Sequence, residues 1–340
     1  MKHPQKCRAA IACVALSSAA WVGLAIADDG PASAGVELPG EVVAAASAFS
    51  AYVEQASGLS SRFSGGESVA QALRASASYE PAQFQEGMIG FGALAALQDG
   101  RFVNGVEAAA NQAGSRQALA QRIAAEPTIV LRFEGAAEAA GRVEAALHVR
   151  GASLFGVGSD VKQAAYAIQH QVWSTVAVAD GAGRLAEVKA LSVRRRVPSD
   201  GDNAHLIQAA TSPAASGSAD ELRPTGVVVR ALALAAEADL GAARNDDLPR
   251  LQPLLADSST ADCLRMSKLN LYQCMAVAGP QYEDVFCLGQ HALMDTGQCM
   301  TKAAGETAVA MASPVPAPIP QAERPFIVPV ARRSLVSTAN

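Results

Sequence analysis

Apolar residues recur at three- and four-residue intervals along most of the chain, which is the spacing of one buried face of an α-helix. Val42, Ala46, Phe49 and Val53 form one such face near the start of the pattern. From residue 40 to about residue 192 the pattern predicts six or seven helices. They are separated by helix-breaking dipeptides at 65–66, 80–81, 99–100, 126–127 and 180–181. We therefore expect residues 40–192 to form an irregular, alanine-rich helical bundle.

Three helices of this bundle have distinct expected positions. Residues 88–97 are the most apolar stretch and predict a central helix. The alanine-rich residues 134–147 predict a peripheral helix. Ser159 has the character of an N-cap, and it predicts a helix that begins there and runs to about Val178.

The pattern changes after residue 192. Residues 193–224 are rich in Arg, Pro, Gly and Ser and predict a flexible linker. Residues 225–304 predict an isolated helix from Val227 to about Ala243, followed by a helical segment that contains four cysteines. Six prolines between positions 314 and 329 predict that residues 305–340 form an extended, disordered tail. The expected fold class is all-α, a bundle followed by a disulfide-stapled helical hairpin.

Composition narrows the range of partners. The 340 residues are 50% apolar and 17% charged, with a formal net charge of −5. This balance excludes a fully disordered chain, and it lacks the basic excess that nucleic-acid binding requires, so we expect no nucleic-acid partner. Much of the apolar content is alanine, which buries little surface per residue, so the core should be thin.

The N-terminus has the composition of a secretory signal peptide. Lys2, Lys6 and Arg8 precede an uncharged run that ends at Ala25-Ile26-Ala27, before two aspartates. We predict that residues 1–27 are a signal peptide cleaved after Ala27, leaving a periplasmic or secreted chain with a net charge of −8. An uncleaved membrane anchor is the alternative for this run. No later run of about 18 apolar residues occurs, so we expect no transmembrane segment in the mature chain.

The four cysteines of the mature chain lie within 37 consecutive residues. Cys263 and Cys274 precede the helix-breaking pair at 279–280, and Cys287 and Cys299 follow it. Clustered cysteines in an exported protein imply disulfides. The spacings of 11 and 12 residues climb roughly 16 and 18 Å along two helices, so each outer cysteine lies opposite the other. We predict nested pairing, Cys263 with Cys299 and Cys274 with Cys287.

The two spacings are not equivalent. Eleven residues are close to three helical turns and return to the same helix face, whereas twelve demand a bend or rotation in the second helix. A zinc site that uses Cys274, Cys287, His291 and one more cysteine is the alternative. The segment lacks a CxxC pair, however, and an exported location favours oxidation.

Two segments carry a resemblance to known proteins. They are Cys263-Leu-Arg-Met-Ser-Lys-Leu-Asn-Leu-Tyr-Gln-Cys274 and Tyr282-Glu-Asp-Val-Phe-Cys-Leu-Gly-Gln-His291. Over residues 260–304 the chain resembles exported helical proteins of GC-rich proteobacteria. It is also similar in outline to twin-cysteine hairpins of the coiled-coil-helix-coiled-coil-helix type, which have nine residues between paired cysteines where this chain has 10 and 11. Neither resemblance implies catalytic residues.

Two short motifs suggest catalysis. Glu67 follows two glycines and begins a helix, and it is similar to the catalytic glutamate of lytic transglycosylases, which requires a buried carboxyl group with a raised pKa. The alternative is a first-turn carboxylate that the helix dipole stabilises. Ser159 and Lys162 match the Ser-x-x-Lys motif of penicillin-recognising enzymes, but the companion motifs are missing, and Ser159 is more simply an N-cap.

One aromatic stripe suggests ligand binding. Tyr166, His170 and Trp173 share a helix face at i, i+4 and i+7, where they could stack on a sugar ring or pack into the core. No phosphate loop, dinucleotide fingerprint or histidine pair with metal-ligand spacing occurs, so we expect no cofactor and no metal.

These patterns favour an exported, non-catalytic envelope protein that acts in scaffolding or partner binding, with an envelope protein or peptidoglycan as partner. A transglycosylase-like enzyme that uses Glu67 and a carbohydrate or small-ligand binder at the Tyr166 stripe are the alternatives.

Overall fold

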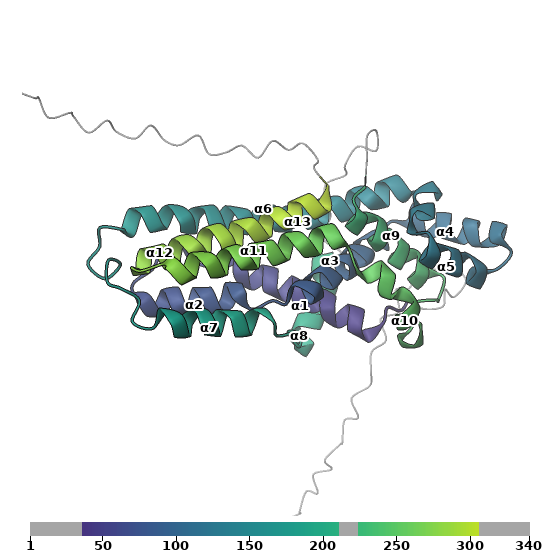
Figure 1. Ribbon diagram of the computed structural model, residues 1–340. Helices are drawn as coiled ribbons and strands as arrows, with labels where there is room; N and C mark the ends of the chain where they lie inside the picture. The colour runs from purple at the N-terminus through teal and green to yellow at the C-terminus, as the bar shows by residue number, and fades with distance from the viewer. Residues whose placement is uncertain (1–35, 211–223, 306–340) are drawn as a thin grey trace, which may run out of the picture.

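The computed structural model describes residues 36–210 and 224–305, and these form an elongated, all-helical body (Figure 1). No β-strand occurs among them, so the predicted all-α class is confirmed. The helices are α1 (Gly40–Ser57), α2 (Gly66–Ala77), α3 (Pro81–Ala96), α4 (Gly100–Ala113), α5 (Arg116–Ala125), α6 (Ala136–Ile168), α7 (Gly181–Ser192), α8 (Asp200–Ala210), α9 (Gly226–Asp239), α10 (Leu248–Leu251), α11 (Ser258–Val277), α12 (Gln281–Cys287) and α13 (Asp295–Ala304). A π-helical segment, Leu288–Met294, joins α12 to α13, and 3₁₀ turns span Pro127–Arg132, Asn245–Asp247 and Gln252–Leu255. The predicted signal peptide and nearly all of the predicted tail lie outside the described residues.

Helices α2, α3, α4 and α7 begin at predicted breaks, and side-chain caps fix several of these starts. The carboxylate of Glu80 accepts hydrogen bonds from the first backbone N–H groups of α3, with Pro81 at its first position. Asp99 caps α4 and Asp180 caps α7 in the same way. Each carboxylate pairs backbone donors that a helix start leaves without an intrahelical partner.

The core is built around α3 and α9. The predicted central position of residues 88–97 is confirmed, because α3 packs against α1, α6 and α9 and its Met88 and Phe91 are fully buried. The expectation that α9 is isolated is wrong. Residues Val227 to Ala238 of α9 are almost entirely buried among α3, α6 and the Pro127–Arg132 turn. A helix that is apolar all round belongs inside a body, and α9 has that character.

The longest helix, α6, corrects two expectations. Residues 134–147 are not peripheral, since Ala139, Val143 and Leu147 are fully buried. Ser159 lies within the 33-residue helix rather than at its start, and the helix ends at Ile168 instead of about Val178. A helix start at Ser159 was expected from its N-cap character, but packing against α13 and the π-helical segment supports one continuous helix.

Helix α6 and the C-terminal helical segment approach each other closely at glycines. A Cβ added at Gly158 of α6 would lie 2.6 Å from the backbone nitrogen of Met294, and one at Gly289 would lie 2.5 Å from the nitrogen of Lys162. Gly151 and Gly297 face each other in the same way. Four glycines thus let the backbones of α6 and the C-terminal helical segment touch, and dispersion contacts between backbones stabilise the pair.

The predicted flexible linker, residues 193–224, is wrong for its first half. Residues 200–210 form α8, which packs on α1 and α3 with Leu206 buried, while residues 211–223 lie outside the described part of the chain. Leu206 anchors α8 because its burial outweighs the polar composition of the surrounding residues. Helices from both predicted domains share one core, with α13 against α6 and α9 against α3.

Candidate functional site

The cysteine hairpin has the predicted nested disulfides. Cys263 pairs with Cys299 at a Cα–Cα distance of 5.7 Å, and Cys274 pairs with Cys287 at 5.6 Å. The chain reverses between Val277 and Gln281, at the predicted Gly279-Pro280 turn. Because both Cys274 and Cys287 are oxidised, their thiolates are not available for the alternative zinc site. Among the described residues, no group of three His, Cys, Asp or Glu side chains has the arrangement of a metal site.

The π-helical segment explains how a twelve-residue spacing fits an eleven-residue partner. At about 100° per residue, eleven residues return to within about 20° of the starting face, whereas a twelfth turns the side chain about 100° further away. A π-bulge accommodates one extra residue in a helix. Leu288–Met294 lies between Cys287 and Cys299 and therefore brings Cys299 back to the face that meets Cys263.

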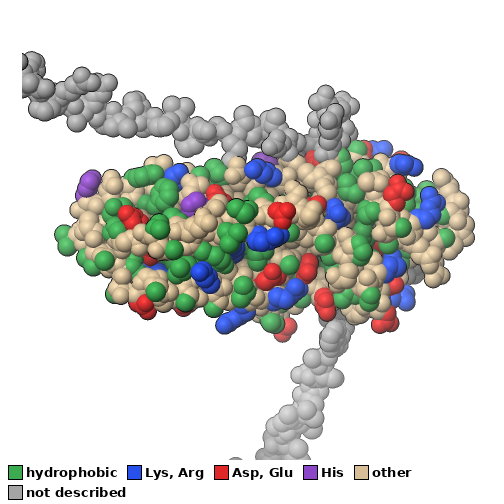
Figure 2. Space-filling model, in the orientation of Figure 1, with side chains coloured by type: hydrophobic (Ala, Val, Ile, Leu, Met, Phe, Trp, Pro, Cys, Tyr) green, Lys and Arg blue, Asp and Glu red, His purple; other side chains and the backbone are tan. Residues whose placement is uncertain are grey.

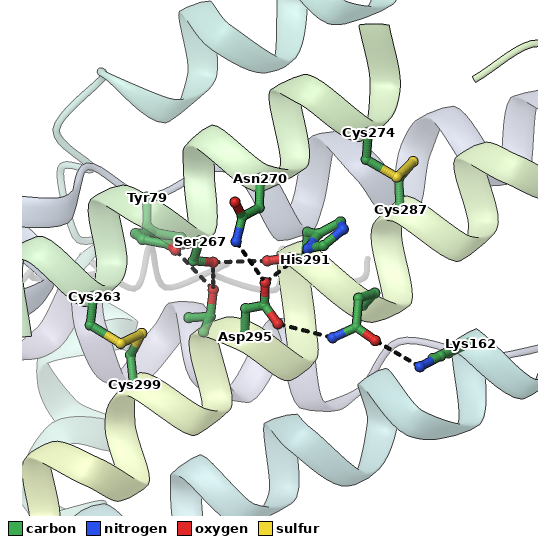
Figure 3. Close-up of polar contacts among 12 residues, drawn as sticks. Tyr79, Lys162, Cys263, Ser267, Asn270, Cys274, Cys287, His291, Asp295 and Cys299 are labelled. Atoms are coloured by element: carbon green, nitrogen blue, oxygen red, sulfur yellow. Dashed lines mark hydrogen bonds and ion pairs between the residues drawn. A yellow bond between two sulfur atoms is a disulfide. The ribbon is translucent and has the colours of Figure 1, made fainter. Parts of the chain in front are cut away.

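A buried polar network holds α11 against this widened helix (Figure 3). The Ser267 hydroxyl donates to the His291 backbone oxygen, 2.8 Å away, and lies 3.0 Å from the Thr296 hydroxyl. The Tyr79 hydroxyl lies 2.9 Å from the same Thr296 oxygen. The Ser267, Thr296 and Tyr79 side chains are all buried, so they stabilise the packing of the hairpin on the bundle rather than meet a solvent-borne ligand.

The carboxylate of Asp295 is a second centre of hydrogen bonding in Figure 3. It lies 2.8 Å from Nδ1 of His291 and accepts from Gln290 at 3.0 Å. Burial raises the pKa of Asp295, but the hydrogen bonds from His291 and Gln290 outweigh that effect and hold this pKa below its ordinary value. Lys162 of α6 donates to the Gln290 side chain at 2.8 Å, which ties the network to the long helix.

Lys268 is the most deeply buried cation near the hairpin. Its Nζ donates to the Ala77 carbonyl oxygen at 2.8 Å and lies 3.4 Å from the centre of the Tyr79 ring. Burial lowers the pKa of Lys268 well below its ordinary value, and the charge of Glu80 only partly opposes this. Because Lys268 is only 4% exposed, it can anchor α11 but cannot reach a substrate in solution.

The accessible feature of the hairpin is a cleft of about 360 Å³ at its turn, which we call the tip cleft. Its walls come from the end of α6, the end of α11 and the whole of α12, and the Cys274–Cys287 disulfide forms part of the lining. The lining residues are Ala165, Tyr166, Gln169, Cys274, Val277, Ala278, Tyr282, Glu283, Phe286 and Cys287.

The chemistry of the tip cleft is aromatic and apolar. The Tyr166 and Phe286 rings meet edge to face with centroids 6.1 Å apart, and Tyr166 remains 49% exposed. Val277, at the end of α11, is 83% exposed. Glu283 carries the only charge among the lining residues, and it accepts a hydrogen bond from the Gly279 backbone N–H at 2.7 Å. The cleft therefore offers flat rings and aliphatic carbon, with its carboxylate already paired.

Exposed apolar residues continue around the tip cleft. Val172 and Val176 are 86% and 56% exposed, and they lie in the segment that follows α6. Backbone hydrogen bonds fix this segment to the hairpin turn, including one from the Tyr282 N–H to the Ser174 oxygen at 3.1 Å. Figure 2 shows this end of the molecule on the left, with hydrophobic side chains exposed between few charged ones. Exposed apolar patches are frequent at the interaction surfaces of proteins.

The structure separates the predicted Tyr166, His170 and Trp173 stripe. Because α6 ends at Ile168, the three side chains do not share one helix face, and that expectation is wrong. His170 is exposed, and the half-buried Trp173 donates from its indole N–H to the Gln171 side chain at 2.6 Å. Tyr166 alone belongs to the tip cleft.

Sequence reasoning missed the aromatic partners that the structure gives Tyr166. Tyr282 and Phe286 lie four residues apart in α12, which places them on one helical face. This spacing was the available signal. Their proximity to Tyr166 could not be read from it, since that depends on how α6 and α12 pack.

Neither Glu67 nor Ser159 has the environment that its predicted role requires. The Glu67 side chain is 72% exposed in the first turn of α2 and forms a 2.6 Å ion pair with Arg74, so the buried setting that a transglycosylase acid requires is not found around it. Ser159 lies inside α6, so its expected role as an N-cap is wrong, and Lys162 is bonded to Gln290.

Buried carboxyl groups occur elsewhere in the body. Burial raises the pKa of Glu144 to about 7. Burial also raises the pKa of Glu237 to about 7, even though its Oε1 lies 2.9 Å from an Arg250 nitrogen. Both carboxyl groups lie on helices of the core, α6 and α9, so they affect stability rather than the tip cleft.

No protein-family model matches the chain, and no curated protein or solved structure shows significant similarity to it.

Proposed function

We propose that this protein is exported and acts in the envelope as a non-catalytic partner-binding or scaffolding protein. Its tip cleft binds an uncharged, extended peptide segment of a partner. The observation that carries the proposal is an exposed aromatic cleft built on a frame that two disulfides brace. None of the described helices has the length and hydropathy of a membrane span.

The leader sequence and the disulfides support export. Residues 1–27 have the charge and hydropathy order of a signal peptide, and disulfides persist in oxidising compartments. The test is intact-mass analysis of native protein from fractionated cells. We expect a chain that begins at Asp28 and contains two disulfides, in the periplasm or medium. Four free thiols, or a cytosolic product that retains the leader, would contradict the proposal.

The lining of the tip cleft favours an extended peptide over a sugar. Aromatic grooves bind proline-rich and aliphatic segments through ring and methylene contacts, and such segments are already extended before they bind. A sugar also stacks on aromatic rings, but it needs several free polar partners around its hydroxyl groups. In the tip cleft the Glu283 carboxylate already accepts hydrogen bonds from the Gly279 N–H and the Tyr282 hydroxyl, which leaves the Gln169 amide and the Tyr166 hydroxyl as the other polar groups of the lining.

A direct binding measurement tests the peptide. The probe is a fluorescent ten-residue peptide of alternating proline and alanine, followed by polarisation with the full chain. Val277→Lys places a charge at the mouth of the tip cleft, and we expect it to weaken peptide binding at least fivefold. Val193→Lys is the matched control, because Val193 is 73% exposed and also lies at the end of a helix, α7. Lysine suits a helix C-terminus at both positions, so neither substitution should unfold the protein.

The outcomes separate the ligand classes. Absence of peptide binding, or equal loss in both variants, would refute the peptide-binding role of the tip cleft. Peptidoglycan fragments that bind the wild type and lose affinity only in Val277→Lys would instead support the carbohydrate alternative.

A further inference from the structure

We propose that the tip cleft binds a segment of this same chain, residues Pro314–Pro320, in an intramolecular contact. The inference rests on the proposed peptide-binding role of the cleft and names its occupant. It is carried by three observations: the chemistry of the segment, the length of chain that precedes it, and the place where α13 ends.

The segment has the chemistry that the tip cleft accepts. Residues 307–322 contain no Asp, Glu, Lys or Arg, and proline stands at positions 314, 316, 318 and 320, with Val, Ala and Ile between. Proline fixes its own φ and disfavours helical conformations at the residue before it. Little conformational entropy is therefore lost when such a segment binds, and no charge has to leave water to enter an apolar cleft.

The length of the intervening chain matches the distance to the tip cleft. Phe286 lies 18 positions before Ala304 along α12, the π-helical segment and α13, which corresponds to roughly 27 Å at the helical rise per residue. Pro314 lies nine positions after Gly305, and a chain of nine residues can span at most roughly 30 Å. Figure 1 shows the end of α13 and α12 at opposite ends of this helical run. Pro314, the first of the four prolines, is therefore far enough along the chain to reach the tip cleft. The residues of the uncharged stretch that precede Pro314 lie too close to the end of α13 to reach it.

Attachment to the chain favours this occupant over a separate partner of equal affinity. A tether that can reach the cleft gives the attached segment an effective concentration there that does not depend on the concentration of the protein. A free segment of the same chemistry must compete with that concentration, so the protein's own segment regulates access to the tip cleft.

Site-specific photocrosslinking in the full chain tests the contact. In Tyr166→benzoylphenylalanine the photoreactive group lies in the tip cleft. The matched control is Val149→benzoylphenylalanine, since Val149 is 65% exposed on the same helix. Val149 also lies nearer the start of the tail, because nearby Gly151 packs against α13 and Gly305 adjoins Glu144. A tail without a preferred site would react at least as often at position 149.

We expect the Tyr166 variant to yield crosslinks to residues 314–320 within a monomer, at several times the yield of the Val149 variant. Equal yields, crosslinks to other parts of the chain, or crosslinks found only in covalent dimers would overturn the intramolecular contact. Dimers joined between position 166 and residues 314–320 would assign the segment of a second copy as the occupant.

A competition measurement separates failure of this inference from failure of the proposed function. In the full chain with Pro314→Ser, Pro316→Ser, Pro318→Ser and Pro320→Ser, the proline–alanine probe should bind about three- to tenfold more tightly than to the wild type, because its competitor is lost. Equal binding to both chains would refute the intramolecular contact and leave the peptide-binding role intact. If the probe binds neither chain, both proposals fail.

Discussion

The two disulfides of the hairpin should stabilise the protein unequally, because they close loops of different length. Cys263–Cys299 closes a loop of 36 residues and Cys274–Cys287 one of 13. In the chain-entropy description, the outer bridge alone lowers the entropy of the unfolded chain by an amount worth about 3.8 kcal/mol, and the inner bridge alone by about 2.9 kcal/mol. A protein that keeps only the outer bridge should therefore be more stable than one that keeps only the inner bridge by about 0.9 kcal/mol.

The comparison uses two double variants, Cys263→Ala with Cys299→Ala and Cys274→Ala with Cys287→Ala. Each pair removes one buried and one half-buried sulfur, since Cys299 and Cys287 are buried and Cys263 and Cys274 are half-buried. The packing loss is therefore similar in both, and the difference reports the loops. Urea unfolding followed by circular dichroism under non-reducing conditions measures the free energy of unfolding of each variant.

We expect both variants to be less stable than the wild type, with the larger loss on removal of the outer bridge. A larger loss on removal of the inner bridge would refute the loop-length argument. It would mean that the inner bridge stabilises the native turn, beside the tip cleft, more than it restricts the unfolded chain.

Two further predictions follow from helix packing and from burial of charge. Gly158→Ala should lower the free energy of unfolding by about 1–3 kcal/mol, because its Cβ would meet the Met294 backbone. Gly156→Ala, two residues away and facing open space, should raise the free energy of unfolding by about 0.5–1 kcal/mol. Denaturant unfolding that gave both substitutions the same sign would contradict the close approach of α6 and the hairpin. Burial raises the pKa of Glu144 to about 7 in the folded protein, from an ordinary value of 4.5. As the pH rises from 4.5 to 7, the carboxyl group ionises in the unfolded chain while it is still protonated in the folded protein, so the free energy of unfolding falls. Glu144→Gln should therefore match the wild type near pH 4.5 and exceed it by about 1–2 kcal/mol at pH 8, and unfolding curves at the two pH values check this difference.

The hairpin could be predicted from the sequence because its geometry is local. The rise and twist of a helix are the same in every protein, so the spacings between Cys263, Cys274, Cys287 and Cys299 predicted which sulfurs meet. The same argument predicted that the second helix must rotate, and the π-helical segment is the form that this rotation takes. The turn at residues 279–280 and the helix starts at capping carboxylates were predictable for the same reason.

Expectations that depended on packing between distant segments were wrong. Residues 134–147 and α9 were assigned to the outside, although Val143 and Leu232 are fully buried. Residues 200–210 were assigned to a linker because their composition is polar, yet Leu206 fixes α8 on the bundle. Periodicity shows that a helix has an apolar face, but not which partner covers that face.

The tip cleft likewise combines features that follow from local sequence with features that follow from packing between distant segments. The sequence by itself determined that the chain is helical and that its C-terminal region is a hairpin joined by two disulfides, and it offered Tyr166 as one residue of a candidate aromatic stripe. The tertiary structure alone decided that α6 stops at Ile168, which separates His170 and Trp173 from Tyr166, and that α12 supplies Phe286 in their place. The physical reason is that helical periodicity and cysteine spacing follow from fixed backbone geometry, whereas the end of α6 and the meeting of three helices depend on contacts between residues more than 100 positions apart.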